Sequence, residues 1–248
     1  MPTFDTPTPI ALTIDFTMAV GEFEIHASDR TDTVVTIRPA TEGRKADVRA
    51  AAETRVVDTG GTVLVEATRV RTNPFSRTGT VHVRVELPTG SRIRATTAAG
   101  GFTCTGVLGA CHLTTHVGDV SVSHANGQVE INTNHGEVEV GDVLGPLRMT
   151  GVNGSMHVGR AHGDVEARTA HGPIRVDEVS AGAVTMTTAA GELEVGIREG
   201  TAAWLDVRTI GGRLRNSLDG IPAPEAADRR VEVRARTYAG DIVIRRAG

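Results

Sequence analysis

Histidines are the residues of this chain with the clearest potential for chemistry, because an imidazole nitrogen can bind a metal ion or titrate near neutral pH. His135 and His171 occupy equivalent positions two copies apart in a sequence repeat, with Asn153 between them. Repeats stacked about 4.8 Å apart would separate the two imidazoles by roughly 10 Å, too far to share one ion bound at about 2 Å. We therefore predict no metal site and interpret the histidines as turn and surface residues, with a weak metal site or a pH-sensing role as the alternative. Seven of the nine histidines lie between residues 112 and 171: His112, His116, His124, His135, His157, His162 and His171.

Carboxylates could serve a carbohydrate-active enzyme, the second kind of chemistry that the sequence permits. Glycoside hydrolysis needs two carboxyl groups at a fixed separation in a cleft, and the candidates are Asp119, Glu137, Glu139 and Asp142. The chain has only five Phe, one Trp and one Tyr to line a sugar groove. It also lacks a phosphate-binding glycine loop, a Ser-His-Asp motif and a helical zinc motif. We predict no catalytic residue and no cofactor, and we interpret Trp204 and Tyr238 as packing or cap residues.

Composition excludes several classes of protein. The net charge of −4 provides no overall field for nucleic acid. The two cysteines, Cys104 and Cys111, form neither a disulfide framework nor a metal-ligand spacing, and their inward parity predicts small apolar core residues. Residues 1–25 lack the basic start and continuous apolar run of a signal peptide, and no stretch approaches the roughly 20 apolar residues of a membrane span. We expect a cytoplasmic protein.

The elements that position these residues come from a repeat of 18 residues, which is the sign of a stacked architecture. Its marker is a glycine, and the spacing lengthens toward the C-terminus: Gly100, Gly118, Gly136, Gly154, Gly172, Gly191, Gly212 and Gly240. Three residues before the marker stands a threonine in every copy but one, where Gly151 replaces it: Thr97, Thr115, Thr133, Thr169, Thr188, Thr209 and Thr237.

Apolar residues alternate with polar ones on both sides of each glycine, which is the signature of β-strands. Each copy therefore predicts two strands of about five residues joined by a glycine turn. The threonines share the parity of the apolar positions, so we place them inside a narrow solenoid, where the hydroxyls can bond to neighbouring rungs and to the turn backbone. Outward residues support parallel stacking, since Glu130, Arg148 and Glu166 alternate in sign on successive copies. By the same logic we expect Glu192 and Glu194 beside Arg213 and Arg215.

The first 90 residues lack this period. Alternation predicts strands near 10–17, 21–26, 33–38, 62–67 and 80–87, a short helix or strand over Asp47–Thr54, and a loop over Arg71–Thr78. A solenoid needs an end cap over its open core and unpaired edge. We therefore predict an N-terminal β-rich cap, 1–90, continuous with a repeat solenoid, 91–248.

Several motifs resemble a known family. They are the opening Thr6–Ile10, TVVTIRP at Thr33–Pro39, LPTGS at Leu87–Ser91, GELEVGIREGTAAWLDVRT at Gly191–Thr209, and RARTYAGDIVIRR at Arg234–Arg246. In these the chain is similar to the bacterial β-strand-repeat proteins called "putative adhesins", in their actinobacterial form, a family of unknown function. The resemblance covers nearly the whole chain. It implies an all-β repeat fold and brings no catalytic residues.

These observations predict an all-β solenoid of about eight repeats that acts as a non-enzymatic structural or protein-interaction scaffold. A ladder that fixes its side chains before binding lowers the ordering cost of recognition. We expect a protein partner, no nucleic acid and no membrane span. Two alternatives stay open: self-association through the solenoid ends, adhesin-like or filament-like, and a carbohydrate-active β-helix enzyme, which is the less favoured.

Overall fold

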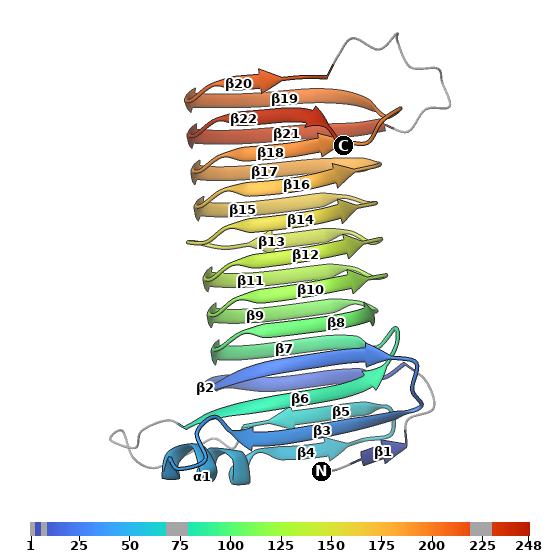
Figure 1. Cartoon of the computed structure of the whole chain (residues 1–248), viewed down its shortest axis with the longest axis vertical. Helices are drawn as coiled ribbons and strands as arrows, with labels where there is room; N and C mark the ends of the chain where they lie inside the picture. Colours follow the sequence, from blue (N-terminus) through green and yellow to red (C-terminus); the bar gives the residue numbers. More distant parts are fainter. Residues whose placement is uncertain (1–2, 6–8, 68–78, 219–229) are drawn as a thin grey trace. The chain divides into compact units, whose positions relative to one another are not determined.

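The computed structural model describes residues 3–5, 9–67, 79–218 and 230–248, and it divides the chain into two compact units, Met1–Asn126 and Gly127–Gly248. The loop predicted over Arg71–Thr78 lies outside the described residues. Within each unit, the strands lie side by side as successive rungs (Figure 1).

The first unit contains one helix and ten described strands. They are β1 (Thr3–Asp5), β2 (Ala11–Ser28), β3 (Asp32–Pro39), α1 (Lys45–Glu53), β4 (Arg55–Asp58), β5 (Thr62–Glu66), β6 (Thr80–Pro88), β7 (Arg92–Ala99), β8 (Phe102–Leu108), β9 (Cys111–Val117) and β10 (Val120–Ala125).

The long strand β2 organises this unit. Its first half pairs in parallel with β5 and β7, and its second half with β6 and β8. The register shifts between Phe16 and Val20, so the strands predicted at 10–17 and 21–26 are two halves of one irregular strand. Strands β7 and β9 then pair in parallel, as do β8 and β10. Strand β2 thus pairs with strands on both sides of residue 90, and the predicted division there stays a prediction.

The remaining strands of the first unit pair in antiparallel fashion, β1 with β3, β3 with β6 and β4 with β5. The ambiguous segment near Asp47 is the helix α1. Its buried Asp47 accepts a hydrogen bond from the Thr80 amide at 2.9 Å, which ties the first turn of the helix to β6. The local alanine-rich sequence favours a helix, and this contact fixes its place.

The second unit consists of two-stranded rungs. Its strands are β11 (Val129–His135), β12 (Val138–Val143), β13 (Leu147–Thr150), β14 (Met156–Ala161), β15 (Val165–His171), β16 (Ile174–Val179), β17 (Gly182–Ala190), β18 (Leu193–Ile197), β19 (Ala202–Gly211), β20 (Leu214–Asn216), β21 (Arg230–Ala239) and β22 (Ile242–Arg246). All of the described pairings in this unit are parallel.

Two parallel sheets face each other across the core of the second unit. The first strands of the rungs form the ladder β11-β13-β15-β17-β21-β19, and the second strands form β12-β14-β16-β18-β22-β20. Inward positions such as Val138, Met149 and Val176 are at most 2% exposed. The predicted all-β solenoid of two-strand repeats is confirmed. The interior of this unit holds mainly Val, Ile, Ala, Leu and Met side chains.

The last two rungs are exchanged relative to the order of the sequence. Val233 of β21 pairs with Val184 of β17 on one side and with Leu205 of β19 on the other, so the rung of β21 and β22 lies inside and the rung of β19 and β20 is terminal. The prediction that Glu194 lies beside Arg215 is therefore wrong, since Val243 stands between them in the register.

Candidate functional site

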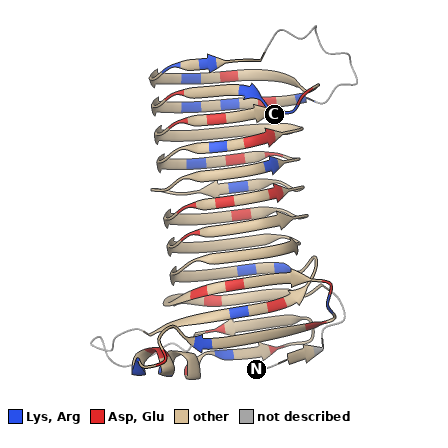
Figure 2. Ribbon diagram, viewed as in Figure 1, with Lys and Arg blue, Asp and Glu red and all other residues tan. Residues whose placement is uncertain are grey.

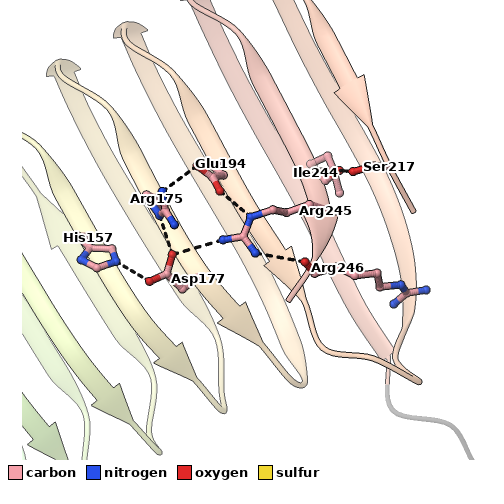
Figure 3. Close-up of polar contacts among 8 residues, drawn as sticks. All are labelled: His157, Arg175, Asp177, Glu194, Ser217, Ile244, Arg245 and Arg246. Carbon is pink, nitrogen blue, oxygen red and sulfur yellow. Dashed lines mark hydrogen bonds and ion pairs between the residues drawn. The ribbon is translucent and has the colours of Figure 1, made fainter. Parts of the chain in front are cut away.

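The best-defined polar surface lies on the outer side of β14, β16, β18 and β22. We call it the charged face and define it as His157, Arg175, Asp177, Glu194 and Arg245 (Figure 3). Parallel register brings these residues together from four strands, with His157 opposite Arg175 and Arg175 opposite Glu194. The face therefore depends directly on the stacking of the repeats.

Bonds between oppositely charged groups hold the charged face in one arrangement. Asp177 accepts from His157 Nε2 at 2.8 Å and from Arg175 Nε at 2.6 Å. Arg245 Nε donates to Glu194 Oε1 at 2.6 Å, and its Nη2 lies 3.4 Å from Asp177 Oδ1. Arg175 Nη1 also reaches Glu194 Oε2 at 3.3 Å. Each carboxylate is thus shared between two arginines, which limits the rotamers open to all of them.

Both signs of charge persist at neutral pH. Partial burial raises the pKa of Asp177, but the hydrogen bonds from Arg175 and His157 outweigh this effect, so its pKa lies below the ordinary value. The hydrogen bond to Asp177 raises the pKa of Arg175. Asp177 and Arg175 consequently present fixed charges of opposite sign.

A second column of alternating charge runs beside the charged face. Asp142, Arg160 and Glu178 are opposite one another in successive rungs, and Arg160 Nη2 donates to Asp142 Oδ2 at 2.7 Å. His162 contacts both Asp142, at 3.1 Å, and Ser180, at 3.3 Å. Figure 2 shows the same interleaving of basic and acidic residues on the strands of the second unit.

The opposite sheet carries the column that the sequence predicted. Glu130 is in register with Arg148, and Arg148 with Glu166, to which it is ion-paired at 2.7 Å. Arg168 also pairs with Glu166, at 2.6 Å. The predicted alternation on the outer surface is confirmed for these three repeats.

The threonines selected from the sequence face the interior. Thr97, Thr115, Thr133, Thr169, Thr188 and Thr237 are buried, and Thr209 is half-buried. Several hydroxyls donate to the turn glycine of the neighbouring rung, as Thr115 does to the Gly100 carbonyl at 2.9 Å and Thr237 to that of Gly191 at 3.2 Å. Thr133 differs, because its buried Oγ1 has no hydrogen-bond partner among the described residues, and Gly151 replaces threonine in the adjacent rung.

The turn glycines stand one above another. Seven have positive φ, namely Gly100, Gly118, Gly136, Gly154, Gly172, Gly191 and Gly240. A Cβ at Gly172 would lie only 2.1 Å from the Gly154 carbonyl oxygen, and one at Gly212, which lacks positive φ, 1.9 Å from that of Gly240. Close stacking of successive turns therefore leaves no room for a side chain at Gly172 or Gly212.

Several of the other residues considered for chemistry make polar contacts. His135 and His171 flank Asn153 in the ladder, and Asn153 Nδ2 lies 3.2 Å from His135 Nδ1. Of the described residues, no group of three or more His, Cys, Asp or Glu could hold a metal ion. Of the four carboxylates considered for carbohydrate chemistry, Asp142 is ion-paired to Arg160 and bonded to His162, so it would have to leave both partners to transfer a proton.

The cysteines are core residues, as their parity predicted. Cys104 and Cys111 are 0% and 3% exposed. Burial raises the pKa of the Cys111 thiol to about 12, and burial together with the neighbouring Cys111 raises the pKa of Cys104 well above its ordinary value. Both thiols stay protonated at neutral pH and are poor nucleophiles.

The aromatic residues Trp204 and Tyr238, interpreted from the sequence as packing or cap residues, are not packed in the core. Trp204 is 56% exposed and Tyr238 69% exposed on the outer side of the terminal rungs, where the guanidinium of Arg234 lies 5.9 Å from the Trp204 ring.

Three residues of the charged face, Arg175, Asp177 and Arg245, were not predicted from the sequence as part of a site. The strand β16 has a register shift between Val176 and Val179, which turns the consecutive residues Asp177 and Glu178 away from the core. Strict alternation along a strand cannot predict two consecutive outward residues. The column of His157, Arg175 and Glu194, in contrast, could have been found by the comparison of repeats that identified Glu130, Arg148 and Glu166.

Stacked two-strand rungs with glycine turns and an ordered polar exterior define a β-solenoid repeat protein. The family model for Toastrack DUF4097 matches residues 13–245, and the chain belongs to this family. No curated protein matches the chain. Of the described residues, none belongs to a helix long and apolar enough to cross a lipid bilayer.

Several solved structures are similar along nearly their whole length. A "putative cell adhesion protein" from Clostridium sporogenes is 12% identical over 98% of this chain and 94% of its own, with a TM-score of 0.24. A "putative adhesin" from Bacteroides fragilis is 12% identical over 98% and 95%, with a TM-score of 0.28. A "putative lipid binding protein" from Parabacteroides distasonis is 12% identical over 98% and 95%, with a TM-score of 0.38.

Proposed function

We propose that the protein is a non-enzymatic interaction scaffold whose charged face binds another protein. The observation that supports this most is the ion-pair lattice of His157, Arg175, Asp177, Glu194 and Arg245, which four strands hold in register. Side chains that are ordered before binding lose little conformational entropy when a partner arrives, so more of the interaction energy appears as affinity.

The arrangement of charge also suits a protein partner. Acidic and basic groups alternate on the charged face and in the adjacent column of Asp142, Arg160 and Glu178. A surface with both signs selects a complementary mixed surface and repels misaligned ones. A polyanion such as nucleic acid would meet repulsive carboxylates at every second rung. A cytoplasmic location remains part of the hypothesis, and fractionation of the source cells would test it.

A matched pair of charge reversals tests the proposal. Arg175→Glu alters the charged face, and Arg148→Glu makes the same change on the opposite sheet, where Arg148 is 57% exposed against 51% for Arg175 and is likewise ion-paired. The wild-type protein and both variants would be used as baits in extracts of the source organism, after circular dichroism has shown the same fold and melting temperature for all three.

We expect a protein that the wild type and Arg148→Glu retain, that Arg175→Glu loses, and that elutes with moderate salt. Salt weakens the interaction because exposed charges are screened beyond about 10 Å at 0.1 M ionic strength. Equal retention by both variants would show that the charged face is not the binding surface. The absence of any retained protein at low salt would contradict the scaffold role itself.

A further inference from the structure

The terminal rung of the second unit leaves part of its core uncovered. The inward residues Val184 and Met186 of an interior rung are fully buried, whereas the equivalent Leu205 and Val207 of β19 are only half-buried. On β20, Leu214 is 52% exposed although it shares its column with the fully buried Ile242. The inward apolar residues of this rung are thus more exposed than their equivalents in the interior rungs.

Strand β19 is also an edge. It pairs with β21 on one side, over nine residue positions, and it has no other strand partner among the described residues. An edge of this length presents a row of backbone donors and acceptors that can pair with another chain. Short strands, prolines, bulges or charged side chains usually block such pairing. Strand β19 runs unbroken for ten residues without proline, and its two charged residues, Asp206 and Arg208, are of opposite sign.

The outward residues of β19 are complementary to themselves. They are Trp204, Asp206, Arg208 and Ile210. If two copies of β19 pair in antiparallel fashion about Val207, Asp206 of each copy faces Arg208 of the other, and Trp204 faces Ile210. Both exposed apolar side chains, 56% and 74% exposed, then gain an apolar neighbour. Arg208 gains an opposite charge, and Asp206, which already lies 3.3 Å from Arg236 Nη2 in its own chain, gains a second one.

Only this register satisfies the charges. A slip that moves the axis by one residue places Asp206 against Asp206 or Arg208 against Arg208, and like charges directly opposite are destabilising. If the axis moves by half a residue, each core-facing side chain of one copy lies opposite an outward-facing side chain of the other. The alternation of side chains along a strand does not allow this arrangement. On the inner side of the favoured register, Val207 meets Val207 and Leu205 meets Thr209, so the open core is covered.

We propose that two copies of this chain form a symmetric dimer by antiparallel pairing of β19 about Val207. The two-fold axis lies along the normal of the sheet, so the terminal rungs face each other and each copy uses the same surface, as a closed two-fold interface requires. Tyr238 adds to the contact, because it is 69% exposed and lies beside Ile210 in the register. The charged face takes no part, so this inference is independent of the proposed function.

Charge reversal tests the interface and its register together. In sedimentation velocity over a wide range of concentration, the wild-type protein is expected to shift from monomer to dimer and no further. Asp206→Arg and Arg208→Asp, each alone, place like charges opposite one another and should weaken the dimer by about tenfold or more in Kd. The double variant Asp206→Arg with Arg208→Asp restores opposite pairs and should recover most of the affinity.

A cysteine pair provides the second readout. Val207→Cys places each thiol beside its symmetry mate, and oxidation should produce a covalent dimer. Leu205→Cys is the matched control, since its mate would lie four residues away along the strand, about 14 Å, beyond disulfide reach. A monomer at the highest concentration, species larger than a dimer, failure of the double reversal to recover, or cross-linking of Leu205→Cys in preference to Val207→Cys would each overturn the proposal.

Discussion

Replacement of Gly172 by alanine should strongly destabilise the second unit. Gly172 has a φ of 138°, and a Cβ there would approach the Gly154 carbonyl oxygen to 2.1 Å. A residue with a side chain in this backbone region costs of order 1–3 kcal/mol. Removal of the overlap requires the two turns to separate, and overpacking of this kind typically costs a further 1–3 kcal/mol. We expect the free energy of unfolding to fall by about 2–6 kcal/mol.

Two other glycines separate these contributions. Gly200 also has positive φ, 73°, but no atom lies within 4 Å of the position that a Cβ would take there, and Gly43 has open space without positive φ. Gly200→Ala should therefore show the backbone cost alone, about 1–2 kcal/mol. Gly43→Ala should be close to neutral.

Urea denaturation monitored by circular dichroism measures the series. With a slope near 2 kcal/mol per molar urea for a unit of this size, Gly172→Ala should lower the midpoint by roughly 2 M, Gly200→Ala by about 0.5–1 M, and Gly43→Ala by almost nothing. If Gly172→Ala and Gly200→Ala unfold at the same midpoint, the tight stacking of successive turns is not present in solution.

Three further predictions concern the interior and the charged face. Thr115→Val removes a hydroxyl that donates to the Gly100 carbonyl at 2.9 Å, and it should lower the free energy of unfolding, measured by thermal unfolding, by about 1 kcal/mol. Thr133→Val removes a buried hydroxyl without a described partner and should be neutral or stabilising. If Thr133→Val is the more destabilising of the two, the hydrogen-bond assignment is wrong. The pKa of Asp177 is lower in the folded protein than in the unfolded chain. Its contribution to the free energy of unfolding is therefore fully present above the unfolded pKa, near 4, and is lost as the pH falls through the folded pKa. Asp177→Asn should therefore flatten the decline of the melting temperature below pH 4, and an unchanged acid profile would show that these ion pairs do not persist in solution. Since burial holds the pKa of Cys111 at about 12 and that of Cys104 far above its ordinary value, a thiol reagent at pH 8 should label neither cysteine in the folded protein and both in urea, and rapid labelling without urea would place them outside the core.

The 18-residue period was sufficient to predict the two-strand rungs, but it did not predict the order of the last two rungs of the second unit. The segments at Ala202–Asn216 and Arg230–Arg246 both carry the inward apolar columns, the threonine and the turn glycine, so each fits above Thr188 equally well. The spacing of 28 residues from Gly212 to Gly240 leaves more chain than one rung needs, and a longer connection allows the chain to return to an inner position. In the structure Arg230–Arg246 lies inside, where Val233 and Ile242 are buried, and Leu214 of the terminal segment is exposed. The pattern of the two segments does not contain this difference.

The candidate site was predictable in part for a similar reason. Outward columns with strict period two, such as Glu130, Arg148 and Glu166, could be read directly from the repeats. The irregularity after Val176 directs Asp177 and Glu178 to the same side, and the exchanged rung brings Arg245 to Glu194. The positions of Asp177 and Arg245 depend on backbone geometry and topology that involve many residues, so no local sequence pattern predicts them.

The proposed scaffold role depends on a charged face that the ladder of β14, β16 and β18 holds rigid before any partner binds. Hydrogen exchange of the backbone amides in the isolated protein, followed by NMR, tests this directly. We predict that amides along these three strands exchange only through cooperative opening of the second unit, and that they slow together as its stability rises. Exchange of the same amides within minutes, independent of stability, would contradict a face that is ordered in advance.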